Sequence, residues 1–521
     1  MPFDQQTFTY QARAQIDGLG YQLMIQMAQL LSSTERHLFR DLSTGKEASA
    51  LKSEYLQKYQ ITARHFNAIR VQLEGKIASA KERQAALASH LEEKIALLTK
   101  RLSKLTDPHK IHQKKRLLSR LTERLQKVQA DIKAKKISLC FGSKRLYNQQ
   151  FHLEENGFGS HEEWQELWQF ARNDSFFLLG SKDESQGNQS CSATVDGNGA
   201  LTLRIRLPNA LTQHGKYLLI PNIRFAYGHD HILKALEEGS AISYRFKCDE
   251  KGWRVFASLS LSRPPVTTST GQGVIGVDIN ADHLAIAESD QFGNPLAKKS
   301  IPLNTYGKDH HQAKALIGDV CASVVALAKK AGKTLVIENL DFAKKKAALK
   351  EKSGPKQSRM LSSLAYNSIK THLKAKGYRE GVEVKEVNPA FTSLIGRVKF
   401  ARRYGLSIHQ AAALCIGRRF LGASERVPRS LEKIPDGKGG HVALPVPVRN
   451  RGKHVWSSWR TLHQKLPTVL AAHFRTKRSS SAKSTCETKT IPKFIGEIPV
   501  RESVDTTARS ASLDRSALVF A

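Results

Sequence analysis

Two carboxylates lie near the ends of predicted strands in the second half of the chain. Residues 273–280 (GVIGVDIN) are predicted to form a buried strand that carries Asp278, and residues 333–340 (KTLVIENL) a second one that carries Glu338. Carboxylates at the tips of neighbouring buried strands repel each other unless divalent cations lie between them. Two Mg²⁺ or Mn²⁺ ions held about 3.5–4 Å apart by oxygen ligands hydrolyse phosphodiesters in this way. The pattern therefore predicts a catalytic pair; the alternative is that each carboxylate only caps or solvates its strand.

The segments between these strands indicate the fold that would position the pair. Residues 284–287, followed by the turn at Gly293-Asn294, predict a β-hairpin that returns beside the first strand. A helical stretch covers residues 311–330 and leads into the second strand. Strands and helices that alternate in this way are typical of an α/β domain.

The charge of the chain indicates a polyanionic partner. Its 82 Lys and Arg residues exceed its 47 Asp and Glu residues by 35. We find no apolar run near the roughly 20 residues that a spanning helix needs, and no secretion signal. The six cysteines are scattered and form no Cys-x-x-Cys pair, so we expect them to be reduced thiols. We expect a cytoplasmic protein of about three domains, without a membrane partner.

Residues 17–137 are predicted to be helical and to include a coiled hairpin. Apolar residues recur at spacings of three and four on both sides of a break at Asp107-Pro108. The other faces carry many Lys and Arg residues. These faces are either the solvated side of a coiled coil or a surface for phosphates.

Residues 138–265 are predicted to form a small β-barrel, to which residues 1–16 add a possible first strand. In the runs 201–207 and 242–247, Arg204, Arg206 and Arg245 alternate with apolar residues, which predicts one basic face. Such barrels commonly bind nucleic acid, although a solvated antiparallel sheet explains the alternation equally well.

A basic and aromatic segment, residues 423–475, follows the α/β region. Its residues Arg449, Arg451 and Lys453 precede Trp456 and Trp459. This cluster would clamp phosphates and stack on bases, or its tryptophans would pack the segment back onto the preceding domain. Residues 476–521 are rich in Ser, Thr and Lys and are predicted to be a disordered tail.

Several of these segments together resemble the RuvC-type core of TnpB (OrfB) proteins, which insertion-sequence transposons encode and which are related to type V CRISPR effector nucleases. The resemblance covers residues 270–422. The matching segments are residues 274–280 (VIGVDIN), 335–340 (LVIENL), the basic stretch Lys344, Lys345 and Lys346, residues 359–366 (RMLSSLAY) and residues 387–393 (VNPAFTS).

The resemblance implies a multidomain α+β protein with an RNase H-like (RuvC) nuclease domain at residues 270–422. The barrel would then be the wedge domain, and the helical region the recognition insert. It also implies that Asp278 and Glu338 bind Mg²⁺ or Mn²⁺, and that the protein cuts DNA under guidance from an RNA derived from the transposon end. In that scheme base pairing reads the sequence, while the protein grips the backbone.

Two departures from the family pattern bear on the site. The family's segment after residues 388–393 leads into a Cys-x-x-Cys zinc ribbon, whereas residues 394–400 (LIGRVKF) contain no cysteine, so we expect no zinc. The family's third carboxylate begins an Ala-rich helix, and His409 stands there in residues 405–414. His409 is either a metal ligand or proton relay, or only a helix-start residue after the cap Ser407.

The histidine in place of the family's third carboxylate leaves other functions open. A neutral imidazole should bind Mg²⁺ less well than a carboxylate, because Mg²⁺ prefers oxygen donors. Asp282, Asp341 and Asp436 are possible substitutes. The alternatives to a guided endonuclease are a guided DNA-binding protein that no longer cuts and a transposase or resolvase of the same fold that works without RNA.

Overall fold

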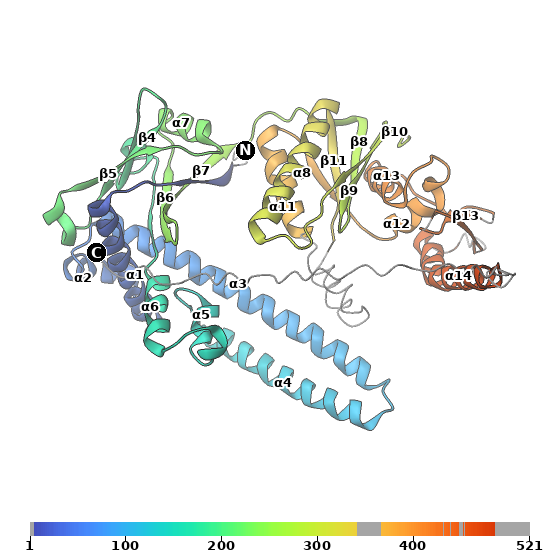
Figure 1. Ribbon diagram of the computed structural model, residues 1–521, viewed down its shortest axis with the longest axis horizontal. Coiled ribbons are helices and arrows are strands. Elements are labelled where there is room, and N and C mark those ends of the chain that lie inside the picture. Colours follow the sequence, from blue (N-terminus) through green and yellow to red (C-terminus); the bar gives the residue numbers. More distant parts are fainter. Residues whose placement is uncertain are drawn as a thin grey trace, which may run out of the picture. The chain divides into compact units, whose positions relative to one another are not determined.

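The computed structural model describes residues 5–340, 366–430, 432–437, 439–447, 452 and 454–484. The chain divides into two compact units, Met1–Arg263 and Pro264–Ala521, and each is described by itself (Figure 1). Among the described residues, no helix combines the length and apolar character that crossing a membrane requires.

Four helices open the first unit after its first strand: α1 (Gly18–Ser43), α2 (Ala48–Lys58), α3 (Ala63–Leu102) and α4 (Pro108–Lys133). The predicted hairpin is confirmed, because α3 and α4 lie side by side and Gln129 of α4 donates to Glu92 of α3 at 3.0 Å (Figure 1). The Asp107 carboxylate caps α4, accepting from the backbone of His109, and Pro108 takes the first helical position.

The strands of the first unit form two open sheets and no closed barrel among the described residues, so the predicted small barrel is not confirmed. The four-stranded sheet has the order β1 (Gln5–Arg13), β7 (Gly252–Ser262), β6 (Ile242–Asp249), β2 (Ser175–Leu178). The three-stranded sheet has the order β3 (Cys191–Val195), β4 (Leu201–Arg206), β5 (Tyr217–Ile223). Alternating apolar residues give each strand one buried face, but they do not specify closure.

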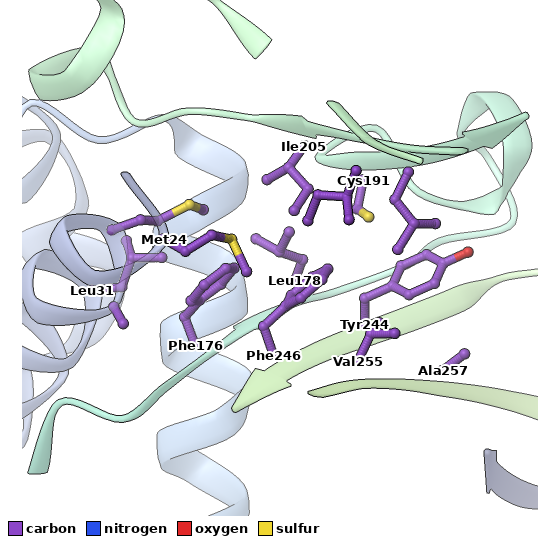
Figure 2. Close-up of a cluster of buried hydrophobic side chains, with 14 of the residues drawn as sticks. Met24, Leu31, Phe176, Leu178, Cys191, Ile205, Tyr244, Phe246, Val255 and Ala257 are labelled. Carbon is purple, nitrogen blue, oxygen red and sulfur yellow. The ribbon is translucent and has the colours of Figure 1, made fainter. Parts of the chain in front are cut away.

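Both sheets bury that face in one common core. Figure 2 shows Cys191 and Ile205 of the three-stranded sheet opposite Phe246 of the four-stranded sheet, with Met24 of α1 beside them. Since the two sheets and α1 share this core, the unit is stabilised without a barrel.

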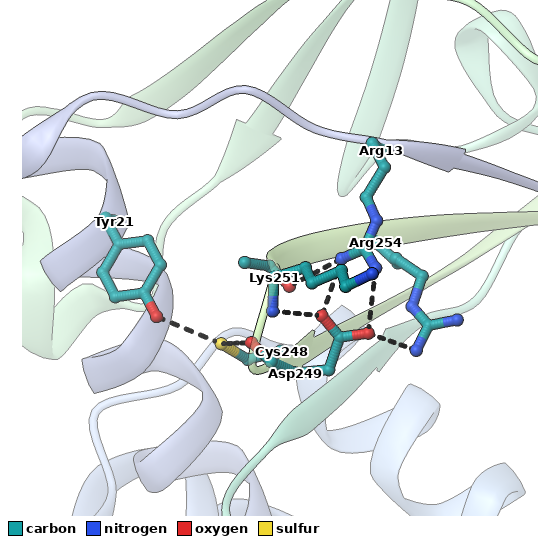
Figure 3. A network of polar contacts seen from close by, with 7 residues as sticks. Arg13, Tyr21, Cys248, Asp249, Lys251 and Arg254 are labelled. Carbon is teal, nitrogen blue, oxygen red and sulfur yellow. Dashed lines mark hydrogen bonds and ion pairs between the residues drawn. The ribbon is translucent and has the colours of Figure 1, made fainter. Parts of the chain in front are cut away.

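A polar network holds the N-terminal strand β1 in its sheet (Figure 3). Arg13 of β1 donates to the Asp249 carboxylate at 2.6 Å, and Arg254 pairs with the same group. The Arg13 guanidinium lowers the pKa of Asp249 to about 2. Lys251 contributes its backbone N–H at 3.0 Å. The tip of the β6–β7 hairpin is therefore tied to a strand from the start of the chain.

Shorter elements complete the first unit: α5 (Lys144–Gln149), η1 (Glu154–Asn156), α6 (His161–Arg172), η2 (Ser185–Gly187), η3 (Asn209–His214) and α7 (His229–Glu237).

A five-stranded sheet forms the centre of the second unit. Its order is β10 (Pro295–Pro302), β9 (His283–Ser289), β8 (Ser269–Ile279), β11 (Lys333–Glu338), β12 (Val384–Val387). The strands β8, β9 and β10 are antiparallel neighbours, whereas β11 runs parallel to both β8 and β12. The predicted β8–β9 hairpin is confirmed, and β11, the second predicted strand, lies beside β8 as expected.

Helices cover both faces of this sheet (Figure 1). On one face, α8 (His310–Ala331) and α11 (Tyr366–Glu380) pack on odd-numbered strand residues such as Val277 and Ile337. The other face carries α13 (Ile408–Phe420), whose Ile416 contacts Val274 and Val336. Side chains alternate across a strand, so even-numbered residues of β8 and β11 face α13.

The remaining elements of the second unit are α12 (Thr392–Ile395), the π-helix η4 (Gly396–Ala401), β13 (Glu432–Pro435), β14 (His441–Leu444) and α14 (Val455–Ser484). Trp459 of α14 is fully buried and donates its indole N–H to the Glu425 carbonyl at 2.7 Å. This tryptophan thus packs the segment onto the α13 side of the unit. The helix continues to Ser484, past the predicted start of the tail at 476.

Candidate functional site

Asp278 and Glu338 occupy neighbouring positions on adjacent strands. Ile337 of β11 pairs with Val277 of β8 in a parallel register, so the next residue on each strand brings Glu338 beside Asp278. Adjacent strands lie about 4.8 Å apart, and partners in register point to the same face. Both carboxylates are largely buried, with 6% and 9% of the residue surface exposed. The sequence predicted this pair.

A glycine on β8 lets α13 approach the carboxylate pair. A Cβ on Gly276 would lie 2.0 Å from the Ala413 carbonyl of α13, so only glycine permits this separation of helix and strand. The helix begins directly after Ser407, whose hydroxyl accepts from Gln410 in a capping box. The predicted cap is confirmed, and it sets where the first turn of α13, with His409, begins.

The His409 ring contacts the first carboxylate. Its Nδ1 lies 3.2 Å from Asp278 Oδ2, and about half of the side chain (48%) is exposed. The hydrogen bond to Asp278 raises the pKa of His409 above its usual value, and burial opposes that effect. The ring therefore lies at the carboxylate and not in the core, although Ser407 also makes it a helix-start residue.

Glu338 is held by residues beyond its strand. The buried Thr392, at the start of α12, donates its hydroxyl to Glu338 Oε1, and Tyr366 of α11 donates to the Glu338 backbone carbonyl. Phe391, just before Thr392, has a φ of 61°, a left-handed conformation that is rare for a large side chain. The resemblance drew attention to residues 387–393, but only the structure gives Thr392 its contact with Glu338.

Two further residues at Asp278 were missed in the sequence. Asn280 donates its side-chain amide to Asp278 Oδ2 at 3.0 Å. His283 packs its ring edge-on against His409, with centroids 5.0 Å apart, and its Nδ1 lies 2.7 Å from Asp282 Oδ1. The bond to His283 lowers the pKa of Asp282. Asn280 follows β8 directly and His283 begins β9, and their polarity so close to a buried strand end was the available signal.

The described residues meet the needs of a metal site only in part. Asp278 and Glu338 provide two adjacent anionic oxygen donors, which suit Mg²⁺ or Mn²⁺. However, within the described ranges no three His, Cys, Asp or Glu side chains are grouped to hold an ion. Metal binding by Asp278, Glu338 and His409 therefore stays a prediction.

The possible substitute carboxylates have other partners or lie outside the described residues. Asp282 pairs with His283. Asp436 is buried in the β13–β14 turn, where it accepts from the Gly440 backbone at 2.9 Å and lies 3.3 Å from His473. Asp341 lies outside the described residues.

The segment where the resemblance would place a zinc ribbon is part of the apolar core. Leu394, Ile395, Val398 and Phe400 of α12 and η4 are buried against α13 and α14. In this chain hydrophobic packing holds that segment in place.

The predicted nucleic-acid contacts lie on both sheets of the first unit. Arg204 is exposed on β4, with its guanidinium 4.7 Å from the Tyr217 ring centroid, and Arg245 is exposed on β6, 5.7 Å from that of Phe177. Arg206 instead bonds to nearby groups, including Asn209 Oδ1 at 3.0 Å. The predicted alternation of exposed arginines with buried apolar residues is thus confirmed. The arginines lie on two different sheets and do not form one basic face.

The other predicted contacts cannot be placed. They lie outside the described residues and comprise Lys344, Lys345, Lys346, Arg449, Arg451 and Lys453.

No protein-family model matches the chain, and no curated protein is similar to it. Among solved structures, a chain of a Cas12f1–sgRNA–target DNA complex is 12% identical, over 80% of this chain and 99% of that chain, with a TM-score of 0.35. RuvC of T. thermophilus with a Holliday junction substrate is 13% identical, over 28% and 88%, with a TM-score of 0.20. A Cas12i1 R-loop complex after target DNA cleavage is 9% identical, over 66% and 61%, with a TM-score of 0.28. At these TM-scores the likenesses establish no function for this chain.

Proposed function

We propose that this chain is an RNA-guided, metal-dependent DNA endonuclease of the RuvC type, as its resemblance to TnpB proteins implies. The observation that carries the proposal is the position of Asp278 and Glu338, which are adjacent in register on the face that α13 covers. His409 at the start of α13 reaches that pair through Asp278. A strand-end carboxylate pair with a third group from the helix above is the arrangement that the sequence predicts.

The residues at the pair have distinct roles in this proposal. Asp278 and Glu338 would hold two Mg²⁺ or Mn²⁺ ions, which supply a clamp for the attacking and leaving oxygens of the phosphodiester. Thr392 and Asn280 fix the orientation of the two carboxylates by donating to them. His409 would complete the ligand set or accept a proton from water.

The exposed arginines on the two sheets of the first unit, Arg204 and Arg245, would contact the nucleic acid. An exposed guanidinium next to an exposed ring, as in Arg204 with Tyr217, contacts phosphate and offers a stacking face to a base. The excess of 35 positive charges over the chain supports a polyanionic partner, and DNA with a guide RNA from the transposon end is the proposed one.

The test is cleavage of a matched DNA by protein co-expressed with its flanking transposon RNA, in Mg²⁺ or Mn²⁺. Asp278→Asn, Glu338→Gln and His409→Ala should each abolish or strongly reduce cleavage. The matched control is Asp290→Asn, because Asp290 lies in the exposed β9–β10 turn and bonds within that turn. Cleavage by all four variants at the wild-type rate would refute the proposed site.

A guided DNA-binding protein that does not cut is the second candidate. It is favoured by His409 at the third position, because an imidazole is a poorer Mg²⁺ ligand than a carboxylate. If wild type binds the guided target but never cuts it, this candidate replaces the first. If the purified protein carries no RNA and still joins DNA ends, a transposase or resolvase that works without RNA replaces both.

A further inference from the structure

The segment between α4 and β2 has a surface unlike the rest of this basic chain. Residues 146–171 contain five Glu, no Asp and no Lys or Arg, a formal charge of −5 in a chain of +35. All five glutamates are exposed: Glu154, Glu155, Glu162, Glu163 and Glu166.

Large apolar side chains lie exposed among these glutamates. Phe151 is 66% exposed, Leu167 48%, and Tyr147 and Phe170 44% each. The Tyr147 ring contacts those of both Phe151 and Trp168, at centroid distances of 6.2 and 5.6 Å. We call these five residues with the five glutamates the acidic aromatic surface.

The local fold does not need these exposed rings. Trp164 forms the small core between α5 and α6: it is 4% exposed, stacks on Trp168 and donates its indole N–H to the Leu146 carbonyl at 2.7 Å. With that anchor in place, Phe151, Leu167 and Phe170 remain in water. Grouped apolar side chains with a polar rim typically mark an interaction site.

A hollow beside Phe151 adds a concave feature. It has a volume of about 370 Å³ and is lined by residues 150–155, Phe158 and Gly159. Phe151, Leu153 and Phe158 give it apolar walls, and Glu154 and Glu155 give it an anionic edge. An Arg or Lys side chain fits this chemistry, because its stem is apolar and its charged end can meet carboxylates and ring faces.

We propose that the acidic aromatic surface binds a basic polypeptide segment of a partner protein, with a Lys or Arg side chain in the hollow and neighbouring apolar residues on Tyr147 and Phe151. Charge complementarity identifies this occupant. Five carboxylates repel phosphates, so the surface disfavours the nucleic acid that the rest of the chain attracts.

The test is selection of peptides from a display library of short random sequences on the full-length protein. The variants are Glu154→Lys/Glu155→Lys and, separately, Phe151→Ser, all at exposed positions. The matched control is Glu237→Lys/Glu238→Lys, an exposed pair at the end of α7 with the same change of charge.

Peptides that combine Lys or Arg with apolar residues should be enriched by wild type and control and lost by both variants. In fluorescence anisotropy their affinity should fall roughly tenfold or more in the variants, about 1.4 kcal/mol per tenfold.

Selection of the same peptides by all proteins would overturn the proposal. Loss of single-stranded RNA binding in the variants would also overturn it, because the surface would then bind nucleic acid. Self-association of wild type that the variants abolish would overturn it in favour of a second copy.

Discussion

Each carboxylate of the pair is oriented by its own donor. Thr392 holds Glu338 from α12, whereas His409 and Asn280 contact Asp278 from α13 and the β8–β9 turn. Donors that fix a ligand strongly affect metal affinity even though they never touch the metal. We therefore expect the uncharged side chains of Thr392 and Asn280 to affect metal binding through the carboxylates that they orient.

The first prediction concerns Thr392, whose hydroxyl can be removed without changing the shape of the side chain. Thr392→Val should weaken Mn²⁺ binding and DNA cleavage by roughly tenfold or more, because Glu338 loses its donor. Mn²⁺ titration followed by electron paramagnetic resonance, with cleavage rates, measures both effects. Thr392→Ser keeps the hydroxyl and should retain both. A valine variant that binds Mn²⁺ as wild type does would show that the contact does not orient Glu338.

At the scale of elements, close backbone packing brings α13 to the site. Gly276 lies against Ala413, and a Cβ on Gly396 would lie 2.5 Å from the Ala411 carbonyl carbon. These approaches place the first turn of α13, with His409, at the end of β8. The distance between helix and sheet thus depends on residues that have no side chain.

The second prediction follows from that packing. Gly276→Ala should displace α13 and destabilise the protein by about 1–3 kcal/mol, the usual cost of overpacking. Because His409 moves with the helix, cleavage should fall as well. Urea unfolding with parallel cleavage rates is the measurement. The control is Gly271→Ala on the same strand, where a Cβ would meet only the Ser269 hydroxyl, at 3.8 Å. Equal stability of the two variants would contradict this role for Gly276.

The third prediction concerns His65, which joins α3 to β4. The side chain is fully buried, and its Nε2 lies 3.2 Å from the Arg206 carbonyl oxygen. Burial lowers the pKa of His65 to about 4. In the unfolded chain this histidine binds a proton below pH about 6.5, whereas in the folded protein it does so only below about pH 4. The free energy of unfolding therefore falls as the pH is lowered through this interval, by about 3 kcal/mol in total.

Urea unfolding of full-length protein at pH 7 and pH 5 tests this linkage. Wild type should lose stability toward pH 5, and His65→Gln should lose less, because glutamine does not titrate. His112→Gln, at an exposed position on α4, should behave as wild type. If the His65→Gln and wild-type curves fall in parallel, the loss has another source.

At the scale of the whole molecule, positive charge dominates, and the acidic aromatic surface is a local exception to it. Neutralising phosphates releases counterions, so affinity for nucleic acid depends steeply on salt. The charge alone identifies a class of partner but not its sequence.

The fourth prediction is a large salt effect on binding to single-stranded RNA. For single strands the slope is about −0.7 per phosphate contact, so with about 6–10 contacts the affinity should fall by roughly 300-fold to 10⁴-fold between about 50 and 200 mM salt. Arg204→Ala should reduce the slope of log affinity against log salt by about one. Fluorescence anisotropy over a salt series measures the slope. The control is Arg13→Ala, since Arg13 pairs with Asp249. An affinity that is independent of salt would contradict phosphate binding.

The sequence by itself determined the local elements and two members of the site. Apolar runs predicted β8 and β11 with Asp278 and Glu338 near their ends, and the Asp107-Pro108 break predicted the α3–α4 hairpin. These signals are local, because side-chain period and capping act over a few residues.

Only the tertiary structure decided most contacts between elements that are far apart in the chain. The N-terminal strand was expected to join the strands of the first unit, and the structure shows that β7 is its partner. The structure also left two open sheets where a barrel was expected, and it brought Thr392 to Glu338 and His283 to His409. Alternation assigns each strand a buried face but no partner strand. Partners are chosen by the packing of a shared core between residues far apart in the chain, and no local pattern records that choice.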